Sequence, residues 1–341
     1  MKYVYVLTSI EEDYYYEQFL LSIFSFRLFN KDAEVILLID ENTKQTLIDK
    51  RTQYEKYISR VIIVNVPNNY SQKEASRWIK TSIHHYVEGE FLYIDCDTII
   101  TEKIESEFFN DIKIGAILDT HVTLEKHHLR NNFRLEDLNA GFSSSLKTNI
   151  RYNGGIVYCS GDSYSTKFFE KWHFLWQNGL KRKCSQDMPS FNQANFEEDN
   201  IITELSGEWN CQIGYNMLPF LHNAKIIHYF ATSLYIQTSP YILASFEILN
   251  KIKDTGTISN EIFNIVNNAK TAFVPESQVI AGKEILDIIN SSIFLNIFWL
   301  RKKLPYIFNF FDKINFILRN PKNIFIKCNS NESRELNDNT L

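Results

Sequence analysis

Short apolar runs alternate with longer amphipathic segments through the first 120 residues. The apolar runs predict β-strands over residues 2–8, 34–39, 60–66, 90–94 and 113–118. The segments between them predict helices over residues 13–29, 42–58 and 71–87. This alternation is typical of an α/β domain in which helices cover both faces of a mostly parallel sheet.

The helix predicted over residues 71–87 has a start signal and two different faces. Ser71 and Glu74 have the spacing of a capping box, which marks the first turn of a helix. Arg77 and Lys80 are three residues apart and therefore share one face. We expect that face to carry positive charge and the other face to be buried.

The pattern is less regular after residue 120. Residues 120–150 are polar and show no clear period, which predicts a long surface loop. Farther along, the segment GGIVYCS predicts a strand, residues 161–178 predict a helix with aromatic residues on its buried side, and residues 225–230 predict a last strand.

Composition changes beyond about residue 235, where segments rich in Ile, Asn and Phe predict helices. We therefore predict a main domain over residues 1–235 with two halves that meet near residue 120, a helical region over residues 236–325, and a disordered polar tail over residues 326–341.

One segment of the helical region, SSIFLNIFWLRKKLPYIFNFF, combines large apolar side chains with Arg301, Lys302 and Lys303. Such a segment can make a peripheral contact with a membrane, here through residues 292–320. It can equally form helices that pack on the main domain or on a partner subunit, because aromatic residues are frequent throughout the chain.

Composition places the protein among ordinary soluble proteins, since 44% of its 341 residues are hydrophobic and 23% are charged. A net charge of −5 gives no general attraction to nucleic acid. Five cysteines without a CxxC pair argue against a disulfide framework or a structural zinc site. The N-terminus lacks a signal-peptide pattern, and no run reaches the roughly 18 apolar residues of a membrane span. We therefore expect a cytoplasmic protein, which the segment above could hold at the inner face of the cell membrane.

The stretch GEFLYIDCDTII is an apolar strand that ends in Asp95, Cys96 and Asp97. Ligands of doubly wound sheets bind beyond the carboxyl ends of the strands. Alternation along an extended chain points Asp95 and Asp97 the same way, within reach of one divalent cation that would also relieve their repulsion. An isolated Asp-x-Asp is more often a solvated strand end, but the apolar run and the cationic helix before it favour a metal site.

FLYIDCDTII resembles the Asp-x-Asp motif of the type-A (GT-A) glycosyltransferases. Over residues 1–235 the chain is similar to their family 8, the group of glycogenin and of bacterial lipopolysaccharide galactosyl- and glucosyltransferases. The resemblance implies a Rossmann-like α/β fold with a mostly parallel sheet, a nucleotide-binding half over residues 1–120, an acceptor-binding half over residues 120–235, and a C-terminal helical extension. It also implies that Asp95 and Asp97, with Cys96 between them, hold Mn²⁺ against the diphosphate of the donor; Mg²⁺ is the alternative ion.

Further segments match the family in the expected order. The resemblance implies that Arg77 and Lys80 face the nucleotide and that His228, in KIIHYF, completes the metal site. A solvated helix face and a satisfied core histidine are the simpler interpretations of these residues. In YNGGIVYCS the matching residues beside the transferred sugar and the acceptor are Asn153, Gly154 and Gly155.

The segment SQDMPSFNQA resembles the Asp-Gln-Pro-x-x-Asn block of the family, with Asp187 as the matching aspartate. Met188 stands where glutamine is usual, and a shift of register places Gln186 in that position. Asp187, Asn153 and Gln186 are therefore the catalytic candidates, although Asp187 could instead cap the following helix. Thr8 and Asp40, at the ends of the first two strands, stand where such folds contact the nucleoside.

The resemblance implies a metal-dependent hexosyltransferase of polysaccharide biosynthesis that retains the anomeric configuration. Its donor would be UDP-glucose or UDP-galactose and its acceptor a glycan or a lipid-linked glycan. One alternative is a phosphatase of the haloacid-dehalogenase type, whose signature threonine would fall at Ile99 rather than at Thr98. Another is a catalytically silent protein that binds sugar nucleotides on the same fold.

Overall fold

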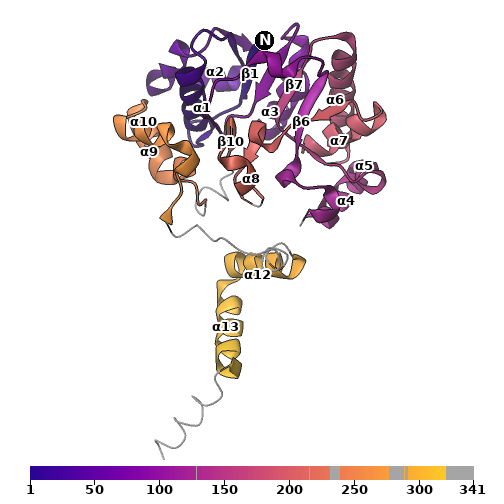
Figure 1. Cartoon of the computed structure of the whole chain (residues 1–341), viewed down its shortest axis with the longest axis vertical. Coiled ribbons are helices and arrows are strands. Elements are labelled where there is room, and N and C mark those ends of the chain that lie inside the picture. Colours follow the sequence, from indigo (N-terminus) through magenta and orange to yellow (C-terminus); the bar gives the residue numbers. More distant parts are fainter. Residues whose placement is uncertain (128, 215, 231–238, 276–287, 289–290, 320–341) are drawn as a thin grey trace, which may run out of the picture. The chain divides into compact units, whose positions relative to one another are not determined.

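The computed structural model describes residues 1–127, 129–214, 216–230, 239–275, 288 and 291–319 of the chain. By its contacts the chain divides into two compact units, Met1–Gln278 and Val279–Leu341. Every strand that is described belongs to the first unit (Figure 1).

The strands of the first unit form two sheets. The larger sheet has the order β3-β2-β1-β4-β7-β6-β8 and the smaller has the order β5-β10-β9. The bounds of the larger sheet are β1 (Lys2–Leu7), β2 (Val35–Ile39), β3 (Arg60–Ile63), β4 (Phe91–Ile94), β6 (Ile114–Leu118), β7 (Tyr152–Cys159) and β8 (Ile202–Glu204). Those of the smaller sheet are β5 (Thr98–Ile100), β9 (Cys211–Gln212) and β10 (Ile226–His228).

The larger sheet is mostly parallel, which confirms the predicted fold class. Strand β1 runs parallel to β2 and β4, β2 runs parallel to β3, and β6 runs parallel to β8. Strand β7 is antiparallel to both of its neighbours, β4 and β6. The N-terminal end of β7 therefore lies at the same edge of the sheet as the carboxyl ends of the parallel strands.

Helices of the first unit cover both faces of this sheet. They are α1 (Tyr15–Phe29), α2 (Glu41–Thr46), α3 (Gln72–Thr81), α4 (Arg130–Ala140), α5 (Ser144–Lys147), α6 (Ser163–Lys181), α7 (Met188–Glu197), α8 (Leu218–Leu221), α9 (Phe246–Thr255) and α10 (Asn260–Asn267). Short 3-10 helices are η1 (Asp49–Lys56), η2 (Ile83–His85), η3 (Ser106–Phe109), η4 (Asp119–His121), η5 (Leu124–Lys126), η6 (Gly207–Asn210), η7 (Ile242–Ala244) and η8 (Ala269–Thr271).

Alternate residues of the central strands enter two separate cores. Tyr5 and Leu37 pack with residues of α1, α9 and the smaller sheet on one face. Val6 and Leu38 pack with residues of α3, α6 and α7 on the other. Because both faces are covered, β2 is buried at every position, and this explains why it is an unbroken apolar run in the sequence.

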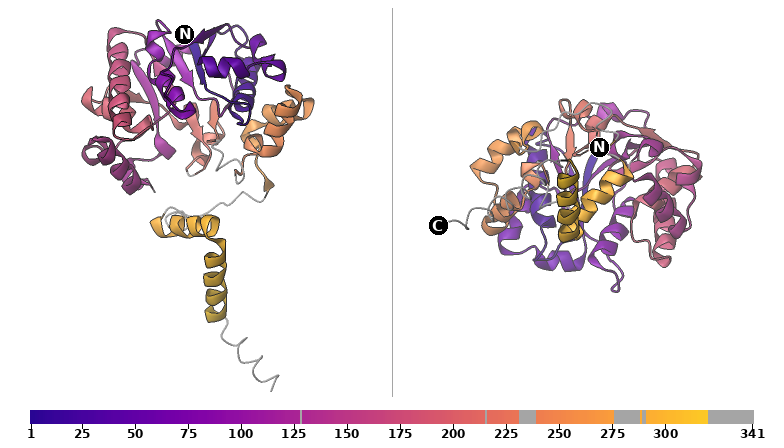
Figure 2. Two further views of the ribbon diagram at one scale, coloured as in Figure 1. Left: turned by 180° about the vertical axis from the view of Figure 1, so that it is seen from behind. Right: turned by 90° about the horizontal axis from the view of Figure 1, so that it is seen from below.

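Helices α9 and α10 belong to the first unit, which ends at Gln278. Both figures show these orange helices beside the indigo N-terminal helices, and α9 contacts α1 (Figures 1 and 2). The division at residue 235 stays a prediction. The tail predicted over residues 326–341 lies outside the described residues.

The predicted surface loop over residues 120–150 is wrong, because this stretch contains α4 and α5. Asp137 of α4 is fully buried, accepts hydrogen bonds from the Ser144 hydroxyl and the Ser145 amide, and lies 3.4 Å from the guanidinium of Arg151. Polar contacts rather than a broad apolar stripe thus hold this segment, which explains why its sequence shows no apolar period.

The second unit contributes α12 (Ser292–Lys303) and α13 (Pro305–Arg319). Of the residues that are described, none forms a helix with the length and apolar character needed to cross a membrane.

A buried ion pair anchors the segment that follows β1. Glu17 of α1 and Arg51 of η1 are both buried, and their side chains approach to 3.1 Å. Arg51 also donates hydrogen bonds to the carbonyls of Ile10 and Asp13 and to the hydroxyl of Ser9. The loop between β1 and α1 is therefore held by one guanidinium.

We expect Glu17→Ala to lower the free energy of unfolding by about 3–5 kcal/mol, because the change leaves a buried guanidinium without its counter-ion. The control is Glu41→Ala, which breaks a pair with Lys44 whose side chains are more than half exposed, and which should cost less than about 1 kcal/mol. Urea denaturation of both variants measures the difference. Equal costs would show that the buried pair does not anchor this loop.

Candidate functional site

The segment of residues 95–97 joins the two sheets, since it follows β4 directly and leads into β5. His228, the last residue of β10, pairs in register with Thr98 of β5. This register brings one side-chain ligand atom each of Asp95, Asp97 and His228 within 4.8 Å of one another. The three residues that the sequence predicted as metal ligands therefore form one cluster, although they come from segments more than 130 residues apart.

Two carboxylates and one imidazole are a donor set that suits a divalent cation such as Mn²⁺ or Mg²⁺. The side chains of Asp95 and Asp97 are 23% and 22% exposed, so both can be reached from outside. His228 is buried, with Nε2 at 3.2 Å from Oδ1 of Asp97. Burial alone would lower the pKa of His228, but the Asp97 carboxylate outweighs it and raises that pKa.

Gly155 makes room for this cluster. It lies in β7, and its carbonyl accepts a hydrogen bond from the Asp95 amide. A Cβ atom at this position would lie 2.4 Å from Cε1 of His228 and 2.9 Å from Oδ2 of Asp95. At Gly154 the nearest atom, Nζ of Lys80, would be 3.6 Å away, an ordinary contact. Of these two glycines, only Gly155 is therefore required by close packing.

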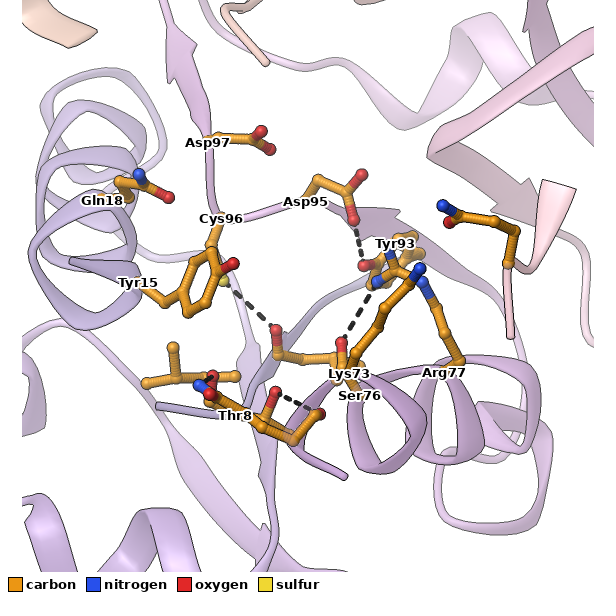
Figure 3. Close-up of a pocket in the computed structure, with 14 residues that line it drawn as sticks. Thr8, Tyr15, Gln18, Lys73, Ser76, Arg77, Tyr93, Asp95, Cys96 and Asp97 are labelled. Atoms are coloured by element: carbon orange, nitrogen blue, oxygen red, sulfur yellow. Dashed lines mark hydrogen bonds between the residues drawn. The ribbon is translucent and has the colours of Figure 1, made fainter. Parts of the chain in front are cut away.

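A cleft of about 380 Å³ opens beside the two aspartates (Figure 3). Its lining includes five residues from the sequence predictions in addition to Asp95, namely Thr8, Arg77, Cys96, Asp97 and Gln186. The other lining residues are Val6, Leu7, Tyr15, Gln18, Gln72, Lys73, Ser76 and Tyr93. In Figure 3 the aspartates lie above the cleft, Thr8 lies below it, and α3 carries Lys73, Ser76 and Arg77 along its side.

Two lining residues and one predicted residue outside the lining have local structural partners. Thr8 donates a hydrogen bond from its hydroxyl to the Gln72 carbonyl. Cys96 donates from its thiol to the Val6 carbonyl, and burial raises the pKa of that thiol well above its usual value. Asp40 is not among the lining residues; its carboxylate accepts a hydrogen bond from the Thr43 amide and caps α2.

A network of opposite charges lies behind the cleft. Lys80 is buried, with Nζ at 3.4 Å from Oδ1 of Asp95 and 3.0 Å from Oδ2 of Asp187. Arg77 lies 2.8 Å from the other oxygen of Asp187. The simpler interpretation of Arg77 and Lys80 as solvated cations is therefore wrong, because both contact buried or partly buried carboxylates.

Asp187 stands at the start of α7, yet its side chain makes no capping hydrogen bond. Burial would raise the pKa of Asp187, but the charges of Arg77 and Lys80 outweigh burial and hold that pKa far below its usual value. The carboxylate is therefore ionised throughout the neutral range. The alternative in which Asp187 serves as a helix cap is not what the structure shows.

Asn153 belongs to a buried chain of polar side chains that reaches the cluster. Its Nδ2 donates to Asp119 at 3.0 Å, and its Oδ1 accepts from Nδ2 of Asn210 at 3.0 Å. Oδ1 of Asn210 in turn lies 3.0 Å from Nδ1 of His228. Asn153 is therefore linked to the candidate metal site through Asn210.

Sequence reasoning did not predict several residues of the site, above all Tyr93, Asp119 and the cleft residues Tyr15, Gln18 and Lys73. The Tyr93 hydroxyl donates a hydrogen bond to Asp95. Alternation along an extended chain could have revealed Tyr93, because it lies in β4 two residues before Asp95, which follows that strand directly. No comparable signal exists for Asp119, whose place depends on contacts between distant segments.

We expect Gly155→Ala to weaken Mn²⁺ binding by about 10- to 100-fold, because the added methyl group displaces His228 and Asp95. Gly154→Ala is the matched control, since its methyl group makes only ordinary contacts, and binding should stay within about twofold. Titration of Mn²⁺ followed by electron paramagnetic resonance measures both affinities. Unchanged binding in Gly155→Ala would contradict the proposed ligand set.

No protein-family model and no curated protein sequence matches the chain. Solved structures that it resembles include mouse xyloside xylosyltransferase 1 (13% identity over 67% of this chain and 96% of that chain, TM-score 0.45). They also include the galactosyltransferase LgtC (13%, 77% and 99%, TM-score 0.46) and the glycosyltransferase GlyE of Streptococcus pneumoniae TIGR4 (15%, 82% and 66%, TM-score 0.46).

Proposed function

We propose that the protein is a metal-dependent glycosyltransferase that moves a hexose from UDP-glucose or UDP-galactose to a glycan or lipid-linked glycan acceptor with retention of configuration. The observation that carries this proposal is the cluster of Asp95, Asp97 and His228 at the carboxyl edge of a mostly parallel sheet, beside a cleft of about 380 Å³. Nucleotide ligands of such sheets bind at this edge. Family 8, the GT-A fold name and the hexose follow from the resemblance of the motifs.

Asp95, Asp97 and His228 would hold the cation, with Mn²⁺ preferred and Mg²⁺ as the alternative. When bound there, it would neutralise the negative charge that develops on the departing diphosphate. Arg77 and the exposed Lys73 add positive charge to the wall of the same cleft. Thr8, together with Tyr15 and Gln18, provides a wall for the nucleoside.

Asp187 and Gln186 would act on the sugar. Two cations keep Asp187 ionised, so it can stabilise positive charge that develops at the anomeric carbon. Gln186 lines the cleft and can exchange hydrogen bonds with sugar hydroxyls. Gly154 lies next to both side chains of this pair, since a Cβ atom there would be 3.6 Å from Nζ of Lys80 and 3.7 Å from Oδ2 of Asp187.

The phosphatase alternative is not favoured. Thr98, one residue before the expected signature position, is fully buried. Its hydroxyl donates to the Asp95 carbonyl and also lies 2.7 Å from the hydroxyl of Ser22. Thr98 therefore fixes the turn between the sheets and does not face the cleft.

We also propose that the second unit contacts an anionic membrane, where a lipid-linked acceptor would reside. Trp299 is 57% exposed and Tyr306 is 89% exposed, and aromatic side chains of this kind favour the membrane interface. Residues 292–319 hold five basic side chains and one acidic side chain, while the chain as a whole has a net charge of −5. This local excess of positive charge complements anionic lipid head groups.

The donor experiment tests the proposed reaction. Purified protein with Mn²⁺ should release UDP from one UDP-sugar, and EDTA should stop the release. Asp97→Asn should lower turnover at least about 100-fold without changing the circular dichroism spectrum, because it removes a metal ligand. Asp254→Asn, on the exposed surface of α9, is the control and should behave like the unchanged protein. If UDP binds with Mn²⁺ but no sugar is released even when glycan acceptors are added, the silent binding protein is the better interpretation.

The membrane contact is tested by co-sedimentation with phosphatidylglycerol vesicles. Replacement of Arg301, Lys302 and Lys303 by alanine should remove about 1 kcal/mol per side chain, so binding should weaken by roughly 100-fold. A control with alanine at three exposed lysines of the first unit, Lys31, Lys126 and Lys181, should leave binding nearly unchanged. Equal sedimentation of both variants would argue against a membrane contact through these helices.

A further inference from the structure

Two buried side chains, Asn153 and Asn210, connect Asp119 to His228 of the metal cluster, and the direction of each hydrogen bond between them can be assigned. Asn153 is the starting point, because the backbone amide of Gly155 donates to its Oδ1 at 2.9 Å. An amide N–H can only donate, so this atom of Asn153 must be the oxygen. The Asn153 Nδ2 group consequently faces Oδ1 of Asp119, at 3.0 Å.

The orientation of the Asn210 side-chain amide is fixed in the same way. Its side chain approaches Oδ1 of Asn153 at 3.0 Å, and an oxygen acceptor requires a donor, so Asn210 must present Nδ2 there. The remaining atom of that amide, Oδ1, therefore faces Nδ1 of His228 at 3.0 Å. Asn210 is fully buried and Asn153 nearly so, which leaves neither amide room to exchange its ends with water.

The hydrogen bond between Asn210 and His228 determines which nitrogen of the imidazole carries a hydrogen. Because Oδ1 of Asn210 only accepts, Nδ1 of His228 must carry a hydrogen. Nδ1 is therefore not available as a ligand atom, and Nε2 is the ring nitrogen that can bind an ion once any hydrogen that it shares with Asp97 has been displaced. Nε2 is the atom that lies 3.2 Å from Asp97, within the cluster with Asp95.

We propose that Asn210 is a positioning residue that holds a hydrogen on Nδ1 of His228, so that Nε2 is the ring nitrogen that serves as the metal ligand. The inference rests on the proposed metal site, and it assigns to Asn210 a role in ion affinity rather than in contact with substrate. Gly155 takes part in two ways, since its amide orients Asn153 and its missing side chain leaves space for the His228 ring.

At the other end of this series of hydrogen bonds, Asp119 also accepts from donors. His127 is buried and accepts a hydrogen bond at Nδ1 from the Leu129 amide, so its hydrogen resides on Nε2, which lies 3.3 Å from Oδ2 of Asp119. Asp119 therefore faces donors from both sides. Its pKa is lowered, because the contacts with His127 and Asn153 outweigh burial. An ionised Asp119 can only accept, which keeps Asn153 in the assigned orientation.

The tautomer can be measured without metal. Protein labelled with ¹⁵N at its eight histidines is studied by long-range ¹H–¹⁵N correlation at about pH 9, where an ordinary histidine is neutral. The His228 signals are identified by their loss in His228→Gln. We expect a protonated Nδ1, whether or not Nε2 also carries a hydrogen toward Asp97. An unprotonated Nδ1 in the unchanged protein would overturn the proposal without any further variant.

Asn210→Leu tests the link to ion affinity. It should weaken Mn²⁺ binding by about 10- to 100-fold and shift His228 toward the Nε2–H form. Asn210→Asp keeps an acceptor for the Nδ1 hydrogen, so the tautomer should be retained. Asn195→Leu is the control, because Asn195 is equally buried but bonds to Ile202 and Asn200, and it should change stability without changing Mn²⁺ affinity.

The outcomes separate the two proposals. If the unchanged protein binds no Mn²⁺, the proposed metal site itself fails. If it binds Mn²⁺ but folded Asn210→Leu has the same affinity and the same tautomer, only the role of Asn210 is refuted. Tautomer and affinity that change together in Asn210→Leu, with Asn195→Leu unaffected, support the proposal.

Discussion

Three carboxylates, those of Asp95, Asp97 and Asp187, converge at one edge of the sheet, and the site depends on how their charge is balanced. Carboxylates so close together repel unless cations or hydrogen-bond donors lie between them. Lys80 lies between Asp95 and Asp187, Arg77 contacts Asp187 from the other side, and His228 contacts Asp97. These contacts supply part of the compensation, and a divalent cation would supply more.

This balance explains why the two sheets meet where they do. Residues 95–97 leave the larger sheet and enter the smaller one, so a single turn belongs to both. The pairing of β10 with β5 places His228 opposite Thr98 and therefore next to Asp97. The pairing of β7 with β4 brings Gly155 against Asp95. A shift of one residue in either pairing would turn these side chains to the opposite face. The cluster is therefore held by strand register and not by flexible loops.

Side chains behind the cluster are as closely constrained as those in it. Asp119, Asn153 and Asn210 are buried, and each has hydrogen-bond partners that leave one assigned orientation. A buried polar group destabilises the folded protein unless it is hydrogen-bonded, so this series of paired side chains favours one arrangement of the site. The cleft side differs, because it is lined by longer side chains such as Lys73, Arg77 and Gln186 that can adjust to a ligand.

The sequence by itself determined the alternation of strands and helices, the strand that ends at Asp95 and the capped start of α3, because these features depend on neighbours a few residues away. It also indicated Asp95, Asp97 and His228, through motifs that resemble a known family. It missed α4, whose stability comes from the buried Asp137, and it could not show that Lys80 is enclosed by two carboxylates. Those contacts join segments far apart in the chain. Only the tertiary structure decided them, because burial and register, rather than local periodicity, determine which distant side chains meet.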